Sequence, residues 1–241
     1  MTEDLHIVSS FDRDLEGIQA HIMKMGGLVE EAILDASQAL IKRDEELSQQ
    51  VHERDAAIDA LEELINDEAA RVIALRSPTA RDLRLILSVI KISGNLERIG
   101  DYAKNLAKRN TVLVHMAPVE GSRRALGRMA REVQMMLKDT LDAYIQRDVE
   151  LAQEILERDN DIDQMYNALF REFLTFMMED PRHITPCMHL HFIAKNTERM
   201  GDHVTNIAEQ VIYLVTGKMP EDSRPKSSLL EADDAADGAD T

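Results

Sequence analysis

Four pairs of acidic residues, each separated by three residues, are the feature of this 241-residue chain best suited to chemistry. They are Asp55/Asp59, Glu97/Asp101, Asp159/Asp163 and Glu198/Asp202. On a helix, positions i and i+4 lie one turn apart on the same face, so each pair presents two carboxylates side by side. One pair alone is typical of a solvated acidic surface, because the chain contains 45 Asp and Glu residues. A cluster of several pairs requires protons or cations, and therefore predicts a cation site.

The acidic pairs belong to an internal repeat. A shift of 104 places residues 41–59 on residues 145–163, and a shift of 101 places residues 95–105 on residues 196–206. Matches at two consistent shifts indicate a duplicated unit of about 100 residues. Other acidic residues lack a counterpart in the second half, for example Glu62, Glu63 and Asp67. This selective retention favours a site over an ordinary acidic surface.

Polar neighbours of the pairs are candidates for completing a metal shell. Oxygen ligands suit hard or borderline ions such as Mg, Mn, Ca or iron. Asn105 and Asn206 follow the last Asp of their motifs by four residues, and each is either a ligand or a hydrogen-bonded surface residue. Arg98 and Arg199 either hold the carboxylates from outside the metal shell or form ordinary i,i+3 surface ion pairs.

Histidine does not indicate a di-iron enzyme. A ferritin-like site needs Glu-x-x-His on two helices, and the only such spacing is Glu3/His6, outside the expected bundle. His203 follows an acidic motif and is a candidate ligand in the second repeat, although its counterpart is Tyr102. Gly100 and Gly201 are unfavourable inside a helix by about 1 kcal/mol relative to Ala. Their repetition predicts a close approach by another backbone or a bound ion.

Apolar residues at intervals of three and four predict helices throughout the chain. Two tandem three-helix bundles are expected, at residues 8–113 and 122–218, because short connections favour antiparallel neighbours. Residues 115–121 form a linker, and residues 219–241 are predicted to be a disordered acidic tail. The expected helices span residues 11–43, 45–76, 79–110, 122–146, 149–179 and 183–216.

Composition excludes several classes of protein. The 28 Lys and Arg residues leave a net charge of −17, which argues against nucleic-acid binding and against charge-driven docking on anionic lipid. The single cysteine, Cys187, excludes an intramolecular disulfide and a multi-cysteine zinc site. No apolar run approaches the ~20 residues that span a bilayer. A soluble cytoplasmic protein without direct membrane insertion is expected, and no cationic pocket is evident.

Two corresponding motif sequences are NLERIGDYAKN (95–105) and NTERMGDHVTNIAE (196–209), each preceded by RDxxID (54–59 and 158–163). These sequences resemble the PhoU family of phosphate-specific transport accessory proteins. The resemblance covers about residues 8–218 and implies two three-helix bundles related by a pseudo-twofold axis. It also implies multinuclear clusters of divalent or trivalent metal ions on the carboxylate motifs. The metal is Mg, Mn, Fe or Zn in different members, so its identity is unknown here.

The resemblance further implies a non-enzymatic negative regulator of phosphate uptake and of the Pho regulon. Such a protein bridges the ATPase subunit of the Pst transporter and the PhoR sensor histidine kinase, as a homodimer in the cytoplasm or peripheral at the inner membrane. Two other classes stay open from the residues alone. They are a carboxylate-bridged metalloenzyme and a metal-free helical scaffold.

Overall fold

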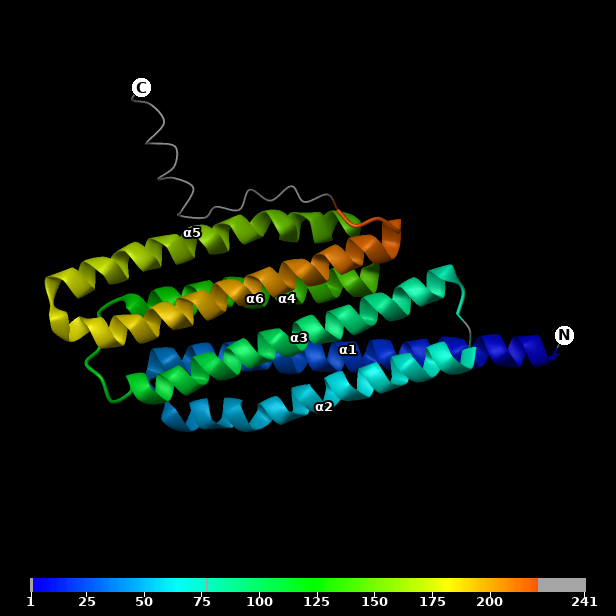
Figure 1. Ribbon diagram of the computed structural model, residues 1–241, viewed down its shortest axis with the longest axis horizontal. Coiled ribbons are helices and arrows are strands. Elements are labelled where there is room, and N and C mark those ends of the chain that lie inside the picture. The colour runs from blue at the N-terminus through cyan, green and yellow to red at the C-terminus, as the bar shows by residue number, and fades with distance from the viewer. Residues whose placement is uncertain (1, 77, 221–241) are drawn as a thin grey trace, which may run out of the picture.

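Six long helices make up the computed structural model, which describes residues 2–76 and 78–220 (Figure 1). Within these residues there is no strand, and the all-α prediction is confirmed. The elements are α1 (Thr2–Lys42), α2 (Glu45–Arg76), α3 (Ala80–Leu113), α4 (Ser122–Gln146), α5 (Val149–Glu179), the short 3-10 turn η1 (Pro181–His183) and α6 (Ile184–Thr216).

Two helix ends differ by more than one residue from those expected. Helix α1 starts at Thr2 rather than residue 11, because no Gly or Pro interrupts the preceding residues. Helix α3 continues past Asn110 to Leu113, because the Asn110 side chain is buried and bonds to another helix instead of ending its own. The expected tail falls mostly on residues 221–241, which lie outside the described residues.

The helices form two side-by-side bundles, α1–α3 and α4–α6, with α3 packed on α6 and α1 packed on α4. Figure 1 shows α3 and α6 running in opposite directions through the middle of the molecule. Tyr102 and His203 occupy corresponding positions of the two repeats, and their ring centroids lie 5.7 Å apart. This contact marks the pseudo-twofold relation between the bundles. None of the described helices has an apolar stretch long enough to cross a bilayer.

Part of the repeat has a structural explanation. Arg43 and Arg147 take corresponding left-handed conformations, each with φ of 59°. The next residue, Asp44 or Asp148, accepts a hydrogen bond from the backbone N–H three residues later, at 2.9 and 3.0 Å respectively. The Arg-Asp pair therefore ends one helix and caps the start of the next in both repeats.

Asn110 is the polar residue of the first bundle whose loss is expected to cost most stability. Its amide Nδ2 donates to the Ala39 carbonyl at 3.0 Å and to Ser48 Oγ at 2.9 Å, and the residue is fully buried. Asn110→Ala strands these buried acceptors, so we expect the free energy of unfolding to fall by about 2–3 kcal/mol in urea melts. Asn105→Ala, exposed on the same helix, is the control. Equal unfolding midpoints for the two variants would contradict this account.

Candidate functional site

The carboxylates of the first repeat gather where α2 packs beside α3. Burial raises the pKa of Asp59, and the charges of Asp55 and Asp101 raise it further. Burial likewise raises the pKa of Glu97, with added repulsion from Asp101 and Asp59. The four predicted residues of this repeat are therefore connected electrostatically, and Asp59 interacts with each of the other three. A structure of this kind holds protons or cations more tightly than isolated carboxylates do.

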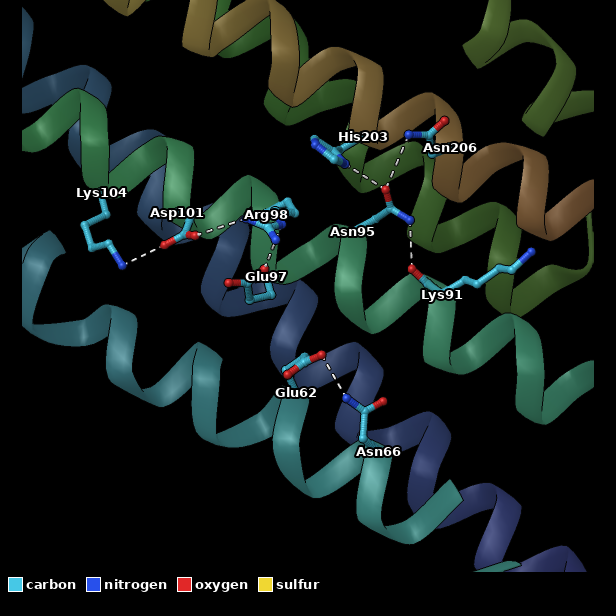
Figure 2. Close-up of polar contacts among 10 residues, drawn as sticks. All are labelled: Glu62, Asn66, Lys91, Asn95, Glu97, Arg98, Asp101, Lys104, His203 and Asn206. Carbon is cyan, nitrogen blue, oxygen red and sulfur yellow. Dashed lines mark hydrogen bonds and ion pairs between the residues drawn. The ribbon is translucent and has the colours of Figure 1, made fainter. Parts of the chain in front are cut away.

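A lysine supplies the positive charge of the first cluster. Lys104 Nζ lies 2.7 Å from Asp101 Oδ1 (Figure 2). It also donates to Asp55, whose side chain is almost fully buried. Burial alone would lower the pKa of Lys104, but hydrogen bonds to Asp101 and Asp55 raise it well above its usual value. The sequence analysis missed this residue, although its i+3 spacing from Asp101 is a signal for an ion pair.

The predicted carboxylates of the second repeat, Asp159, Asp163, Glu198 and Asp202, are the second cluster. A different lysine supplies positive charge there. Lys195 Nζ lies 2.5 Å from Glu198 Oε1. Burial raises the pKa of Glu198; the hydrogen bond from Lys195 opposes this effect and the charge of Asp202 adds to it. The other oxygen, Glu198 Oε2, is buried and has no hydrogen-bond partner within the described part of the chain. Asp159 is buried and Asp163 half-buried on α5.

The two lysines do not correspond between the repeats. The counterpart of Lys104 is Thr205, whose hydroxyl donates to the Asp202 backbone carbonyl at 2.8 Å. The counterpart of Lys195 is Gly94. The repeat thus preserves the carboxylates while the position of the neutralising lysine differs.

The lack of a side chain at Gly100 and Gly201 leaves room for the first carboxylate of each cluster, Asp55 and Asp159. A Cβ atom at Gly100 would lie 3.1 Å from Ile58 Cδ1 and 3.8 Å from Asp55 Oδ1. A Cβ atom at Gly201 would lie 3.1 Å from Asp159 Oδ1. The close approach exists, but it is made by side chains of α2 and α5 rather than by the predicted backbone or bound ion. It places Asp55 and Asp159 against the bare backbone beside the second motif.

Two of the predicted auxiliary ligands point toward the other bundle. His203 Nδ1 lies 2.8 Å from Asn95 Oδ1, and Asn206 Nδ2 lies 3.4 Å from the same oxygen (Figure 2). Asn95 in turn donates to the Lys91 carbonyl at 2.7 Å. These groups join α6 to α3 rather than contacting the carboxylates in this structure.

The remaining auxiliary residues lie on the surface. Arg98 Nε is 3.6 Å from Glu97 Oε2 and Arg98 Nη1 is 4.0 Å from Asp101 Oδ2, with 62% of the arginine side chain exposed. These contacts correspond to the surface ion-pair alternative. Asn105 and Arg199 are also exposed.

The donor chemistry of the clusters suits a hard cation, because the converging groups are carboxylates. Among the described residues, however, no three His, Cys, Asp or Glu side chains form a group that could hold one ion. In the first cluster, Lys104 bonds to two of the carboxylates. A metal ion there requires displacement of the ammonium group, whereas Glu198 Oε2 offers an unpaired oxygen in the second cluster.

These pKa shifts predict the pH dependence of the metal-stripped protein. The pKa values of Glu97 and Glu198 are raised in the folded state, above all by burial, so folding favours their protonated forms. Their stabilising effect is complete below the unfolded-state pKa and is lost as pH rises through the raised values. We expect the melting temperature to fall as the pH rises above about 4.3, the pKa of Glu in an unfolded chain. E97Q/E198Q, which imitates the protonated forms, is expected to show a flatter profile, and an identical slope would contradict the assignment.

A family model described as "PhoU domain" matches residues 22–109 and 126–211, one match in each bundle. The chain belongs to the PhoU family. This membership confirms the resemblance inferred from the repeated motifs, and each matched segment contains both acidic pairs of its repeat.

Curated relatives and solved structures agree with membership of the PhoU family. Two proteins named "Phosphate-specific transport system accessory protein PhoU homolog", from Rhizobium meliloti (strain 1021) and Zymomonas mobilis, are 46% and 49% identical to this chain. Each alignment covers 93% of this chain and 94% of the relative. The crystal structure of PhoU from Pseudomonas aeruginosa has a TM-score of 0.83 at 41% identity, covering 86% of this chain and 100% of that one. The Streptococcus pneumoniae PhoU structure has a TM-score of 0.81 at 30% identity, with coverages of 88% and 99%.

Proposed function

We propose that this PhoU-family protein is an accessory protein of phosphate-specific transport that represses phosphate uptake and the Pho regulon. It acts as a cytoplasmic adaptor between the ATPase subunit of the Pst transporter and the PhoR sensor histidine kinase. The observation that carries the proposal is the near full-length similarity to relatives named as accessory proteins of phosphate-specific transport. The adaptor recognises proteins and catalyses no reaction.

Metal ions on the two carboxylate clusters are part of the proposal. Divalent or trivalent ions, namely Mg, Mn, Fe or Zn, would be held by residues of α2 and α3 in one bundle and of α5 and α6 in the other. Support comes from the mutual repulsion of the first-repeat carboxylates and from the unpaired Glu198 Oε2. The ligands are Asp55, Asp59, Glu97, Asp101, Asp159, Asp163, Glu198 and Asp202.

Charge supports recognition of basic partner surfaces. The net charge of −17 lies on a protein with long helical faces, and complementary charge steers association. Binding to the ATPase subunit and to the kinase is therefore expected to weaken with added salt. We propose that the protein acts as a homodimer.

Deletion of the gene tests the regulatory role. We expect a phosphate-starvation reporter to be fully expressed in phosphate-replete deletion cells, because repression requires the adaptor. Restoring the wild-type gene is expected to restore repression, with the transporter ATPase and the kinase co-purifying with a tagged copy. Normal repression in the deletion strain would refute the proposed function.

A further inference from the structure

Helices α1 and α4 enclose a groove of about 220 Å³ on the outside of the bundle pair. Three arginines of α4 line it, Arg124, Arg128 and Arg131, together with Ser37 and Gln38 of α1. We propose that this groove binds a linear phosphoanion, either inorganic polyphosphate or the phosphate chain of a nucleotide. The proposal is independent of the regulatory function and of the carboxylate clusters.

The three arginines share one face of α4. Their spacing of four and then three residues places them on successive turns, and all three are exposed. Within the described residues, none of them pairs with a carboxylate, and no carboxylate lines the groove. On a chain with a net charge of −17, this concentration of unpaired positive charge is distinctive.

The start of α4 adds to the positive potential. Gly121 supplies no side-chain cap, and the first turn contains no acidic residue. Arg123 and Arg124 lie in that turn instead, where the helix dipole disfavours cations. Arg123 is used structurally, because its Nη1 and Nη2 atoms donate to the Leu40 and Leu113 carbonyls at 3.2 and 3.0 Å. Arg124 has no such role, and a bound anion would offset the unfavourable charge.

The groove is not a product of the internal repeat. Under the shift of 104, the position of Arg128 corresponds to Lys24, while those of Arg124 and Arg131 correspond to Ala20 and Gly27. Only one of the three arginines therefore has a cationic counterpart in the other repeat. Lys24 is exposed and provides a matched control position.

The geometry favours a chain of phosphates over a single one. A rise of 1.5 Å per residue separates Arg124 and Arg131 by about 10 Å along the helix axis. Guanidinium groups spaced along this length can each contact a different phosphate, so two or three linked phosphates make more contacts than a single orthophosphate. Guanidinium groups bind phosphate oxygens in pairs of parallel hydrogen bonds. Ser37 and Gln38 add neutral hydrogen-bonding groups at the side of the groove.

Titration calorimetry on the full-length, metal-stripped protein tests the proposal, because removal of metal prevents phosphate from binding through a metal ion. The probes are tripolyphosphate, ATP, orthophosphate and a tetraglutamate peptide. We expect tripolyphosphate to bind more tightly than orthophosphate and to weaken with salt. ATP binding more tightly than tripolyphosphate identifies a nucleotide as the source, and the reverse order identifies inorganic polyphosphate.

Variants distinguish binding in the groove from non-specific electrostatic attraction of anions. R124A/R128A/R131A is expected to weaken tripolyphosphate binding by about 100-fold, since three charge-assisted contacts are lost. K24A is expected to bind like the wild type, and R124K/R128K/R131K to bind with intermediate affinity, because charge is kept without the planar fork. Circular dichroism confirms folding of each variant. Wild-type affinity in the triple Ala variant, an equal loss in K24A, or tighter binding of tetraglutamate than of tripolyphosphate would overturn the proposal.

Discussion

Replacing Asp101 and Asp202 together by Ala is expected to remove bound metal from both bundles while leaving the helix content nearly unchanged. Each Asp is the second carboxylate of its motif on α3 or α6, next to the glycine that admits the neighbouring carboxylate. Neither residue belongs to the apolar core, and Ala is the best helix former. Elemental analysis of protein purified without chelator measures the loss, and circular dichroism measures the helix content.

E63A/D67A is the matched control for this prediction. Glu63 and Asp67 have the same i,i+4 spacing on α2 and are exposed, but the pair has no counterpart in the second repeat. This variant loses the same number of charges and is expected to keep its metal. Unchanged metal content in D101A/D202A would remove the support for these residues as ligands.

Lys104→Met is expected to strengthen divalent-metal binding in the first bundle by at least about tenfold. A metal must displace the Lys104 ammonium group from Asp55 and Asp101, and charge-assisted hydrogen bonds of this kind contribute about 1.5–3 kcal/mol each. Without metal, the same variant leaves the carboxylates to repel one another, so its melting temperature is expected to fall and to recover on addition of Mn²⁺.

Calorimetric titration of Mn²⁺ into metal-stripped protein measures this change in affinity. Lys108→Met, one turn further along α3 and exposed, is the control and is expected to leave the affinity unchanged. Weaker binding of Mn²⁺ by the Lys104→Met variant would contradict competition between the metal and the Lys104 ammonium group. It would show instead that the lysine holds the carboxylates in the geometry that the metal needs.

Much of the fold could be predicted because its determinants are local. Helical periodicity located all six helices, and the duplication showed which acidic pairs share a face of corresponding helices. The role of the motif glycines was predicted only in outline. The atoms that approach Gly100 and Gly201 belong to other helices, so their identity depends on how α2 packs on α3 and α5 on α6.

Comparison of the two repeats did not predict the roles of Lys104 and Lys195 or the contacts between α3 and α6. Lys104 and Lys195 stand at positions that do not correspond, so comparison of the halves did not select them. His203 and Asn206 follow the acidic motif in sequence, yet they bond to Asn95 across the interface between α6 and α3. Such contacts depend on the tertiary packing of the two bundles.

The arginine groove was missed for a related reason. A net charge of −17 describes the whole chain and does not report where the positive charges gather. Arg124, Arg128 and Arg131 form one surface only when α4 is helical and α1 lies beside it. The groove is therefore not evident from composition or from the linear order of the residues.

Repression by the metal-site variant is the most direct test of the central claim, which joins the carboxylate clusters to phosphate regulation. The measurement is expression of a phosphate-starvation reporter in phosphate-replete cells in which D101A/D202A replaces the wild-type gene, with E63A/D67A as the control. We predict that D101A/D202A cells express the reporter at a level approaching that of the deletion strain, whereas the control cells keep it repressed. Full repression by D101A/D202A protein that has lost its metal would contradict the account.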